Sequence, residues 1–269
     1  MIMNKDTIKN LFTIIKERNP LIHHITNNVT INDCANATLA IGGSPVMATS
    51  IEEVADMVSL ANALVINFGT IDDLTYSAMI RAGQAANEKG IPVVFDPVGV
   101  GATPFRTKKA FDFLKKVHVS IIRGNATEVF ALIGGKAVTR GVDAGDISIS
   151  KEVLAIKTAK QLNTITVISG EIDVVSNGEK TVNIENGDVW LTRITGTGCM
   201  TASLIGCFAG ITDDLFSAAI AGMSVMSLAG ERARNRLQDF DGIGTYRIKL
   251  MDEISLMDGQ IWEEGVRFA

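Results

Sequence analysis

The segment Gly196-Thr197-Gly198-Cys199, which leads into the apolar stretch 200–210, carries the residue types best suited to chemistry. Small residues ahead of a helix leave the backbone N–H groups of its first turn unpaired, and the helix dipole favours negative charge there. The four residues are therefore predicted to form an anion hole. The same dipole is expected to lower the pKa of the Cys199 thiol below its free value, making it a proton acceptor. An ordinary glycine turn beside a small buried cysteine is the alternative, because short glycine patterns are weak signals.

A second segment puts a carboxylate at the end of a strand. The apolar run 91–95 is typical of a buried parallel strand, and it ends at Asp96-Pro97-Val98-Gly99. In open α/β sheets, ligands bind at the carboxyl ends of the strands. Asp96 is therefore a candidate ligand for Mg²⁺, which proteins usually hold through one or two carboxylates and water. A turn or helix-cap aspartate is the alternative.

A third segment repeats the order of strand, polar loop and helix. The apolar run 117–122 ends in Arg123-Gly124-Asn125, and Glu128 opens a helical stretch. Arg123 is suited to hold a phosphate, Asn125 to anchor the loop, and Glu128 to carry a metal ion or its water. Taken singly, Glu128 fits better as a first-turn acid that satisfies the helix dipole. Together the three segments supply an anion hole, magnesium ligands, a cation and a base, which are the parts that phosphoryl transfer requires.

Strand-like apolar runs alternate with helical stretches through the middle of the chain. The runs span residues 45–48, 63–67, 91–95, 117–122 and 165–169. This alternation predicts an α/β fold with a mainly parallel central sheet and helices on both faces. No Pro/Ser-rich linker, charge block or repeat interrupts the pattern, so residues 1–269 are predicted to form a single domain.

The pattern changes after residue 169. Short segments at 172–175 and 181–184 are joined by turn residues, which predicts antiparallel edge strands. The stretches 200–211 and 215–230 are rich in Ala, Gly, Met and Ser, with a helix-cap signal between them. Each is shorter than the roughly 18 to 20 apolar residues that a membrane span needs, so a packed helical hairpin and no membrane association are expected.

Composition fits a cytoplasmic enzyme that acts on small molecules. The chain has 25 basic and 30 acidic residues, a formal net charge of −5, and 46% hydrophobic residues. This balance argues against a nucleic-acid partner, which normally requires a basic face. The three cysteines form no C-x-x-C pair, so neither a disulfide framework nor a structural zinc site is expected, and a reducing cytoplasm is the expected compartment.

Six motifs follow one another along most of the chain. They are Pro20-Leu21-Ile22-His23-His24-Ile25-Thr26-Asn27-Asn28-Val29, Gly43-Ser44-Pro45-Val46-Met47, Asn67-Phe68-Gly69-Thr70, Asp96-Pro97-Val98-Gly99, Arg123-Gly124-Asn125 and Gly196-Thr197-Gly198-Cys199. In this order they resemble the hydroxyethylthiazole kinase family, a branch of the ribokinase-like superfamily. The resemblance implies a three-layer ribokinase-like sandwich. It also implies ATP-dependent phosphorylation of 4-methyl-5-(2-hydroxyethyl)thiazole, a step of thiamine biosynthesis or salvage.

The resemblance further implies roles for single residues. Asn27, Met47, Gly69 and Gly196 would lie at the thiazole, Arg123, Ser169 and the neighbouring Asn125 at the nucleotide, and Asp96 and Glu128 at Mg²⁺. The family forms trimers with active sites at subunit interfaces, so a homotrimer is implied. Met47 suits a sulfur heteroaromatic because its thioether is polarizable. The histidines at 23 and 24 are expected to orient or pack the Asn27 loop, since the chain has only one other histidine.

Cys199 stands where the wider superfamily usually has an aspartate. This cysteine in place of the aspartate matches the thiazole-kinase branch. Because a loose phosphoryl-transfer transition state needs little proton transfer, a weak thiol base would suffice. The hypothesis is that Cys199 accepts the proton of the substrate hydroxyl while the loop N–H groups stabilise the transferring phosphoryl. The alternatives are a related kinase of a pyridoxal or hydroxymethylpyrimidine alcohol, a nucleotide-dependent repair dehydratase on the same fold, and a non-catalytic trimer that binds thiazole or nucleotide.

Overall fold

A computed structural model describes residues 5–135 and 149–269, and a twisted eight-stranded sheet runs through it. The strands are β1 (Leu21–Ile25), β2 (Ser44–Val46), β3 (Ala63–Asn67), β4 (Val93–Asp96), β5 (Ile121–Asn125), β6 (Ile165–Ser169), β7 (Asp173–Ser176) and β8 (Thr181–Ile184). Their spatial order is β2-β1-β3-β4-β5-β6-β7-β8. Strands β1 to β6 pair in parallel, whereas β7 and β8 are antiparallel. The predicted sheet is thereby confirmed, with its antiparallel strands at one edge.

Three strands differ most from the sequence prediction, whereas β4 and β7 are shifted by only one or two residues from the predicted runs 91–95 and 172–175. Strand β1 was not among the predicted runs, because His23 and His24 interrupt its apolar pattern, yet both side chains are buried. Strand β5 begins at Ile121 and not at residue 117, because Val117 is the C-terminal cap of the preceding helix. The strand thus extends through Arg123 to Asn125, which the prediction had placed in a loop. Strand β2 is shorter than the predicted run 45–48.

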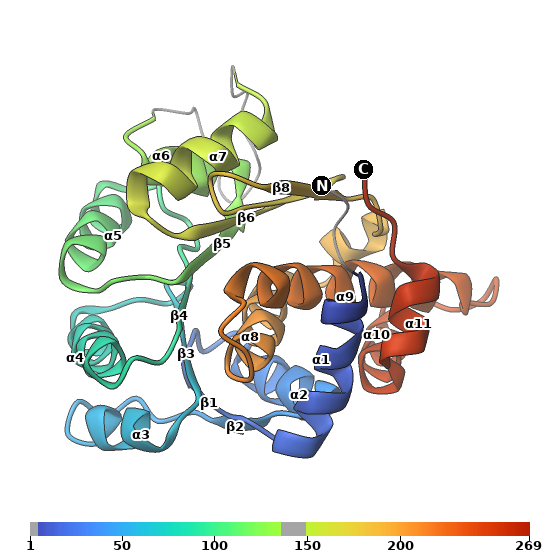
Figure 1. The fold of residues 1–269 in the computed structure, drawn as a ribbon, viewed down its shortest axis with the longest axis horizontal. Helices are drawn as coiled ribbons and strands as arrows, with labels where there is room; N and C mark the ends of the chain where they lie inside the picture. Colours follow the sequence, from blue (N-terminus) through green and yellow to red (C-terminus); the bar gives the residue numbers. More distant parts are fainter. Residues whose placement is uncertain (1–4, 136–148) are drawn as a thin grey trace.

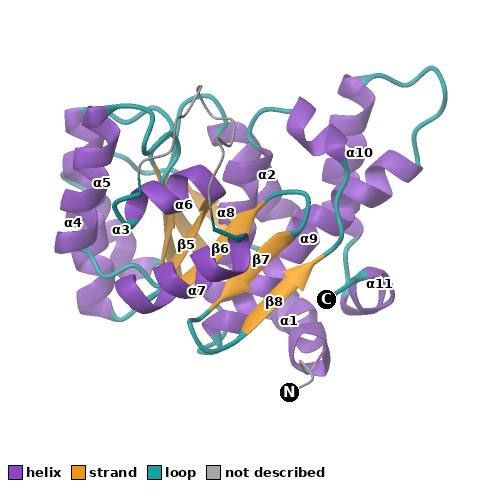
Figure 2. Cartoon of the chain, turned by 90° about the horizontal axis from the view of Figure 1, so that it is seen from above, coloured by secondary structure: helices purple, strands orange, loops and turns teal. Residues whose placement is uncertain are grey.

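Helices cover both faces of the sheet and complete the three predicted layers, seen along the short axis in Figure 1 and from above in Figure 2. One face carries α3 (Val54–Leu60), α4 (Asp73–Lys89), α5 (Pro104–Lys116), α6 (Ala126–Leu132) and α7 (Lys151–Leu162). The other carries α1 (Lys5–Arg18), α2 (Ile31–Ile41), α8 (Thr197–Ala209) and α9 (Leu215–Asn235). Beyond these, α10 (Ile243–Leu256) packs on α9 and α2, and α11 (Gly259–Gly265) packs on α1. A short 3₁₀ helix, η1 (Val189–Arg193), precedes α8.

Helices α8 and α9 form the predicted hairpin. A side chain at Gly222 of α9 would meet the backbone of Ile205 in α8 at 2.5 Å, so the two helices touch backbone to backbone. Helix α9 has 21 residues and outlasts the predicted stretch because it continues through the polar residues 231–235. Within residues 5–135 and 149–269, no helix combines the length and the apolar character that crossing a membrane demands.

The alternation of side chains along β3 determines which groups reach the site. Leu64 and Ile66 belong to the apolar cluster beneath α3 to α7, whereas Ala63 and Val65 belong to the cluster beneath α8 and α9. Successive side chains of a strand point to opposite faces. Asn67, two residues after Val65, therefore projects to the face that α8 covers.

Candidate active site

The predicted site residues meet where the parallel strands end and α8 begins. Asn27 follows β1, Asn67 ends β3, Asp96 ends β4 and Arg123 lies near the end of β5. The chain leaves β1 for β2 on one side and returns to β3 on the other. Such a reversal opens a crevice at the carboxyl ends of the strands, the usual ligand site of open α/β sheets.

Helix α8 begins with three unpaired backbone donors. Gly196 is the N-terminal cap, with a φ of 90° in the left-handed region that glycine favours. The N–H of Met200 donates to the Gly196 carbonyl at 2.8 Å, so the intrahelical bonds start there. The N–H groups of Thr197, Gly198 and Cys199 have no acceptor among the described residues. They are free to bind a ligand atom beside the sheet edge.

The guanidinium of Arg123 lies directly against this helix start. A Cβ at Gly198 would overlap Nη1 of Arg123, so only glycine leaves room for the guanidinium. Nη2 donates to Oγ of Ser169 at 2.8 Å, and Nη1 lies 3.9 Å from Oδ2 of Asp96. Nε is buried without a partner among the described residues. The side chain is thus fixed in place, and its Nε–H donor still lacks an acceptor among the described residues.

The thiol of Cys199 is held by two amides. Its Sγ accepts hydrogen bonds from Nδ2 of Asn27 and Nδ2 of Asn67, both at 3.3 Å. Burial and the nearby Asp96 carboxylate raise the pKa of Cys199. The predicted lowering of this pKa is therefore wrong, because desolvation and a like charge outweigh the helix dipole. The thiol keeps its proton at neutral pH.

Asn27 is anchored on both sides of its amide. Its Oδ1 accepts from the backbone N–H groups of Val29 and Thr30 and from the Thr30 hydroxyl, at 3.0 to 3.1 Å. Gly69, in the turn after β3, packs against it, since a Cβ there would lie 2.6 Å from the Asn27 Cβ. Gly196 likewise packs against Thr30. Asn27, Gly69, Gly196 and Cys199 are thus brought together, as their predicted roles require.

Asp96 is fully buried and only partly satisfied. Oδ2 accepts from Nδ2 of Asn67 at 2.8 Å, whereas Oδ1 has no partner among the described residues. Burial raises the pKa of Asp96 to about 7, although the Arg123 charge lowers it. An orphaned carboxylate oxygen beside a ligand crevice fits a hard cation such as Mg²⁺. In the described ranges no three His, Cys, Asp or Glu side chains converge as a full ligand set, so water or phosphate would supply the remaining ligands.

Glu128 has a structural role in the loop after β5. Its carboxylate accepts from the N–H groups of Gly99 and Asn125 at 2.8 and 2.9 Å, and Oδ1 of Asn125 accepts from the Glu128 N–H at 2.9 Å. Asn125 and Glu128 thereby form a capping box at the start of α6. Burial raises the pKa of Glu128. The contacts of Glu128 therefore match the alternative stated for it, an acid in the first turn of a helix. A role in metal binding would be additional.

A cavity of about 690 Å³ opens beside Arg123. Arg123, Asn125 and Ser169 line it together with Thr197 and Gly198. Its volume is in the range of small-molecule and cofactor pockets. The cavity is also lined by Asp173 of β7 and by Met223, Met226 and Ser227 of α9. Sequence reasoning missed these four, because no local pattern distinguishes them from ordinary core residues.

Among the described residues, Met47 and the two histidines form no hydrogen bond with this cluster. Met47 is half-buried just after the edge strand β2. His23 bonds the Ala48 carbonyl at 2.8 Å, and His24 bonds the Thr38 hydroxyl at 3.4 Å. Burial lowers the pKa of both rings, that of His24 to about 4. The neutral histidines therefore tie β1 to the loop after β2 and to α2, and neither forms a hydrogen bond with the Asn27 loop that they were expected to orient or pack.

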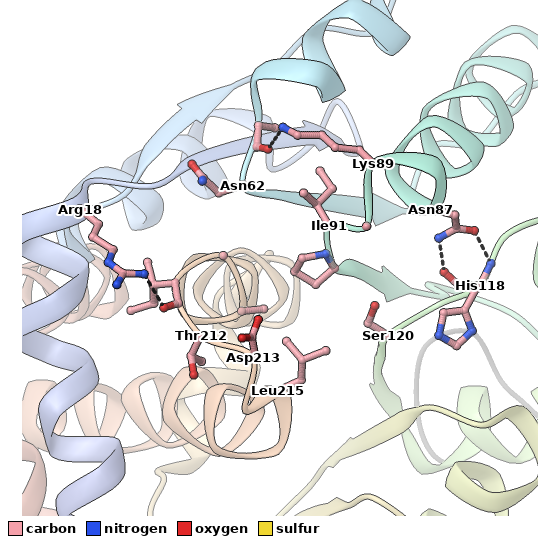
Figure 3. Close-up of a pocket in the computed structure, with 16 residues that line it drawn as sticks. Arg18, Asn62, Asn87, Lys89, Ile91, His118, Ser120, Thr212, Asp213 and Leu215 are labelled. Carbon is pink, nitrogen blue, oxygen red and sulfur yellow. Dashed lines mark hydrogen bonds between the residues drawn. The ribbon is translucent and has the colours of Figure 1, made fainter.

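A second cavity, of about 660 Å³, lies at the opposite ends of the strands (Figure 3). Two of its cations are already engaged: Lys89 donates to the carbonyls of Val58 and Ala61, and Arg18 donates to that of Ile211. They neutralise the carbonyl ends of helices α3 and α8. None of the predicted site residues lines this cavity.

The three layers and the order of the strands define a ribokinase-like fold. A ribokinase-like superfamily protein from Enterococcus faecalis shares this fold with a TM-score of 0.63, at 11% identity over 94% of each chain.

The chain belongs to the hydroxyethylthiazole kinase family, which it matches over residues 12–260. A hydroxyethylthiazole kinase of Alkaliphilus oremlandii is 50% identical to it, over 91% of this chain and 90% of the relative. The solved structure of the hydroxyethylthiazole kinase protein from Pyrococcus horikoshii OT3 has a TM-score of 0.87 at 34% identity and covers 98% of both chains.

Proposed function

We propose that this protein transfers the γ-phosphoryl group of ATP to the hydroxyl of 4-methyl-5-(2-hydroxyethyl)thiazole, in thiamine biosynthesis or salvage. Membership of the family supports the substrate. One geometric observation carries the chemistry: the Cys199 thiol accepts from the Asn27 amide, and Thr197 and Gly198, which precede it at the free start of α8, line the cavity beside Arg123. An alcohol on one side and a nucleotide on the other would then approach each other along the helix start, as in-line transfer requires.

On the substrate side we assign the thiazole to Asn27, Met47, Gly69 and Gly196. The contact of Gly69 with Asn27 and of Gly196 with Thr30 supports this assignment, since Gly69 borders the Asn27 amide and the Thr30 hydroxyl donates to that amide. The hydroxyl would face Cys199, whose thiolate form accepts its proton as the new O–P bond forms and the bond from the γ-phosphorus to the departing ADP breaks. Because burial raises the pKa of Cys199, little of this thiolate is present in the resting enzyme, so most of the rate enhancement comes from positioning and charge.

On the nucleotide side we assign the phosphates to Arg123, Ser169 and the N–H groups of Thr197, Gly198 and Cys199, with Asn125 shaping the loop. The hydrogen bond between Arg123 and Ser169 supports a preset guanidinium. Donors fixed in advance stabilise the developing charge without reorganisation during the reaction.

Asp96 is the residue that would hold Mg²⁺, with Glu128 beside it. The orphaned Oδ1 of Asp96 supports this assignment, as does the close carboxylate of Glu128, which raises the pKa of Asp96. When bound, such an ion neutralises charge on the nucleotide phosphates. Arg123 contributes a second, fixed positive charge at the same edge.

We also propose a single-domain, cytoplasmic protein that assembles as a homotrimer with active sites at subunit interfaces. Large apolar side chains are exposed at Val29, Leu39 and Ile51, on the segments that flank the edge strand β2. Exposed apolar surface of this kind is typical of protein interfaces. Met47 lies at the same edge, so a neighbouring subunit would complete the thiazole pocket. The free thiols of the chain's three cysteines fit a reducing compartment.

The direct test is identification of the product. The purified protein is incubated with Mg-ATP and the thiazole alcohol, and the products are followed by ³¹P NMR and mass spectrometry. A new phosphate monoester, formed in step with ADP and coupled to a neighbouring methylene, supports transfer to the hydroxyethyl oxygen. Free inorganic phosphate without this ester would mean that water, and not the alcohol, is the acceptor.

Related kinases of pyridoxal or hydroxymethylpyrimidine alcohols, and a repair dehydratase, would share the nucleotide side. The family match favours the thiazole over these substrates. A non-catalytic binding trimer would need neither the orphaned Asp96 oxygen nor a thiol held by two amides at the start of α8.

A further inference from the structure

Asn67, the last residue of β3, uses every hydrogen-bonding atom of its amide. Its Oδ1 accepts from the Gly69 N–H at 2.8 Å and from Nδ2 of Asn27 at 3.0 Å. Its Nδ2 donates to Oδ2 of Asp96 at 2.8 Å and to Sγ of Cys199 at 3.3 Å. Only 1% of the residue is exposed, so these four bonds have no competition from bulk water.

Two of the neighbours fix the orientation of this amide. The Gly69 N–H can only donate, so the atom that faces it is the oxygen. The Asp96 carboxylate, when ionised, can only accept, so the atom that faces it is the nitrogen. No other side chain of this size offers two acceptor sites and two donors in one plane. Aspartate supplies only the acceptors, and alanine supplies neither.

The partners of Asn67 come from three different elements. Asn27 follows β1, Asp96 ends β4 and Cys199 lies in the first turn of α8. Each of these segments carries a different part of the site: the Asn27 amide on the substrate side, the Asp96 carboxylate with its orphaned oxygen, and the Cys199 thiol. A single rigid amide therefore sets the distances among three groups that the chain contributes separately.

We propose that Asn67 is the positioning residue of this site: its acceptor half orients Asn27 for the alcohol substrate, and its donor half aligns the Cys199 thiol with Asp96. The proposal rests on the proposed function. It predicts that the two halves can be separated by substitution. Removing the whole amide impairs substrate binding and turnover, whereas removing only the donors impairs turnover alone.

The test compares Asn67→Ala and Asn67→Asp with wild type. Asn62→Ala is the matched control, because Asn62 also bonds across β1 and β3, accepting from the Leu21 N–H at 2.8 Å, but at the far end of the strands. Thiazole affinity is measured by calorimetry without ATP or metal, and kcat and the KM for ATP are measured at pH 9, where the introduced carboxyl is ionised. Circular dichroism and unfolding midpoints verify the fold of each variant.

Asn67→Ala should weaken thiazole binding about tenfold and lower kcat about a hundredfold, as expected when buried partners lose their hydrogen bonds. Asn67→Asp keeps the acceptors, so its thiazole affinity should stay within about threefold of wild type while kcat falls as in Asn67→Ala. The KM for ATP should stay within about twofold in both, and Asn62→Ala should match wild type in every reading.

Two results would overturn the proposal: wild-type kcat in folded Asn67→Asp, or equal loss of thiazole affinity in both variants. Should Asn67→Ala fail to fold, Asn67→Asp alone decides through its affinity and kcat. A wild-type protein that binds no thiazole would instead contradict the proposed function, since the calorimetry contains neither nucleotide nor metal.

Discussion

At the scale of single residues, the buried carboxylate of Asp96 lowers the stability of the fold. The carboxylate is fully buried, one oxygen lacks a partner among the described residues, and its pKa is raised to about 7 mainly by burial. An aspartate in the unfolded chain has a pKa near 3.9. Between these values the native protein holds a proton that the unfolded chain releases, so stability falls as the pH rises through this window. Above about pH 7 the penalty is constant.

Asp96→Asn should therefore stabilise the metal-free protein while removing activity. The gain in unfolding free energy should be small at pH 4 and grow towards pH 7, reaching on the order of 2 to 4 kcal/mol. Urea unfolding at pH 4.5 and pH 8 without metal measures it. Adding Mg²⁺ and nucleotide should stabilise wild type more than the variant. A variant less stable than wild type at pH 8 would show that the carboxylate is not a burden on the fold.

Cys199 is the second residue whose environment makes a prediction. Cys199→Ala should lower kcat strongly and leave thiazole affinity nearly unchanged, whereas Cys199→Asp should retain activity. Because the thiolate is the active form and burial raises the pKa of Cys199, kcat of wild type should rise with pH from 7 to 9. In Cys199→Asp this rise should disappear. Steady-state kinetics across that range provides the measurement, and a folded but inactive Cys199→Asp would count against the base role.

At the scale of elements, the start of α8 was the most predictable feature. Small residues before an apolar stretch correctly indicated the start of a helix, although α8 begins at Thr197, ahead of the predicted stretch 200–211. The apolar runs at 63–67 and 165–169 were also correct at both ends, because buried parallel strands leave a continuous apolar signal. Strand β1 was missed since histidines break that signal, and the start of β5 was misplaced because Val117 and Val119 serve a helix end and a loop.

The close contact between Gly198 of α8 and Arg123 of β5 yields a prediction for this element. Gly198→Ala should displace the guanidinium and raise the KM for ATP about tenfold or more, because bonds to charged groups are the strong ones. Thiazole affinity without nucleotide should be unchanged.

Gly244→Ala is the matched control, since Gly244 is likewise the second residue of its helix and a Cβ there meets no atom within 4 Å. It should leave kinetics unchanged and stabilise the protein by roughly 0.5 to 1 kcal/mol. Equal ATP kinetics in the two alanine variants would mean that Arg123 does not need the space above Gly198.

At the scale of the whole molecule, the sequence indicated which loops would meet but not which hydrogen bonds join them. Asp96, Arg123 and Cys199 were predicted because each ends an apolar run or opens one. Asn67 was not assigned a role, since its importance depends on partners from three other segments. Met223 and Met226 reach the cavity from the middle of α9, where the local pattern is that of a core helix.

The proposed trimer is tested at this scale by its mass. Sedimentation analysis should give three times the 28.7 kDa of the chain. Leu39→Asp, at a residue that is 57% exposed beside β2, should dissociate the assembly and raise the KM for thiazole. Leu74→Asp is the control, because Leu74 is 83% exposed on α4, which lies on the opposite face of the sheet. A fully active monomer would contradict sites shared between subunits.

The central claim is that the alcohol acceptor is the hydroxyethylthiazole. ADP release from Mg-ATP by the purified protein, compared among 4-methyl-5-(2-hydroxyethyl)thiazole, pyridoxal and hydroxymethylpyrimidine at equal concentrations, tests it most directly. The account predicts turnover that depends on the thiazole and exceeds that with the other two alcohols by orders of magnitude. Turnover with only the pyridine or pyrimidine alcohol would contradict the assignment of the substrate pocket, and silence with all three would contradict the assignment as a kinase.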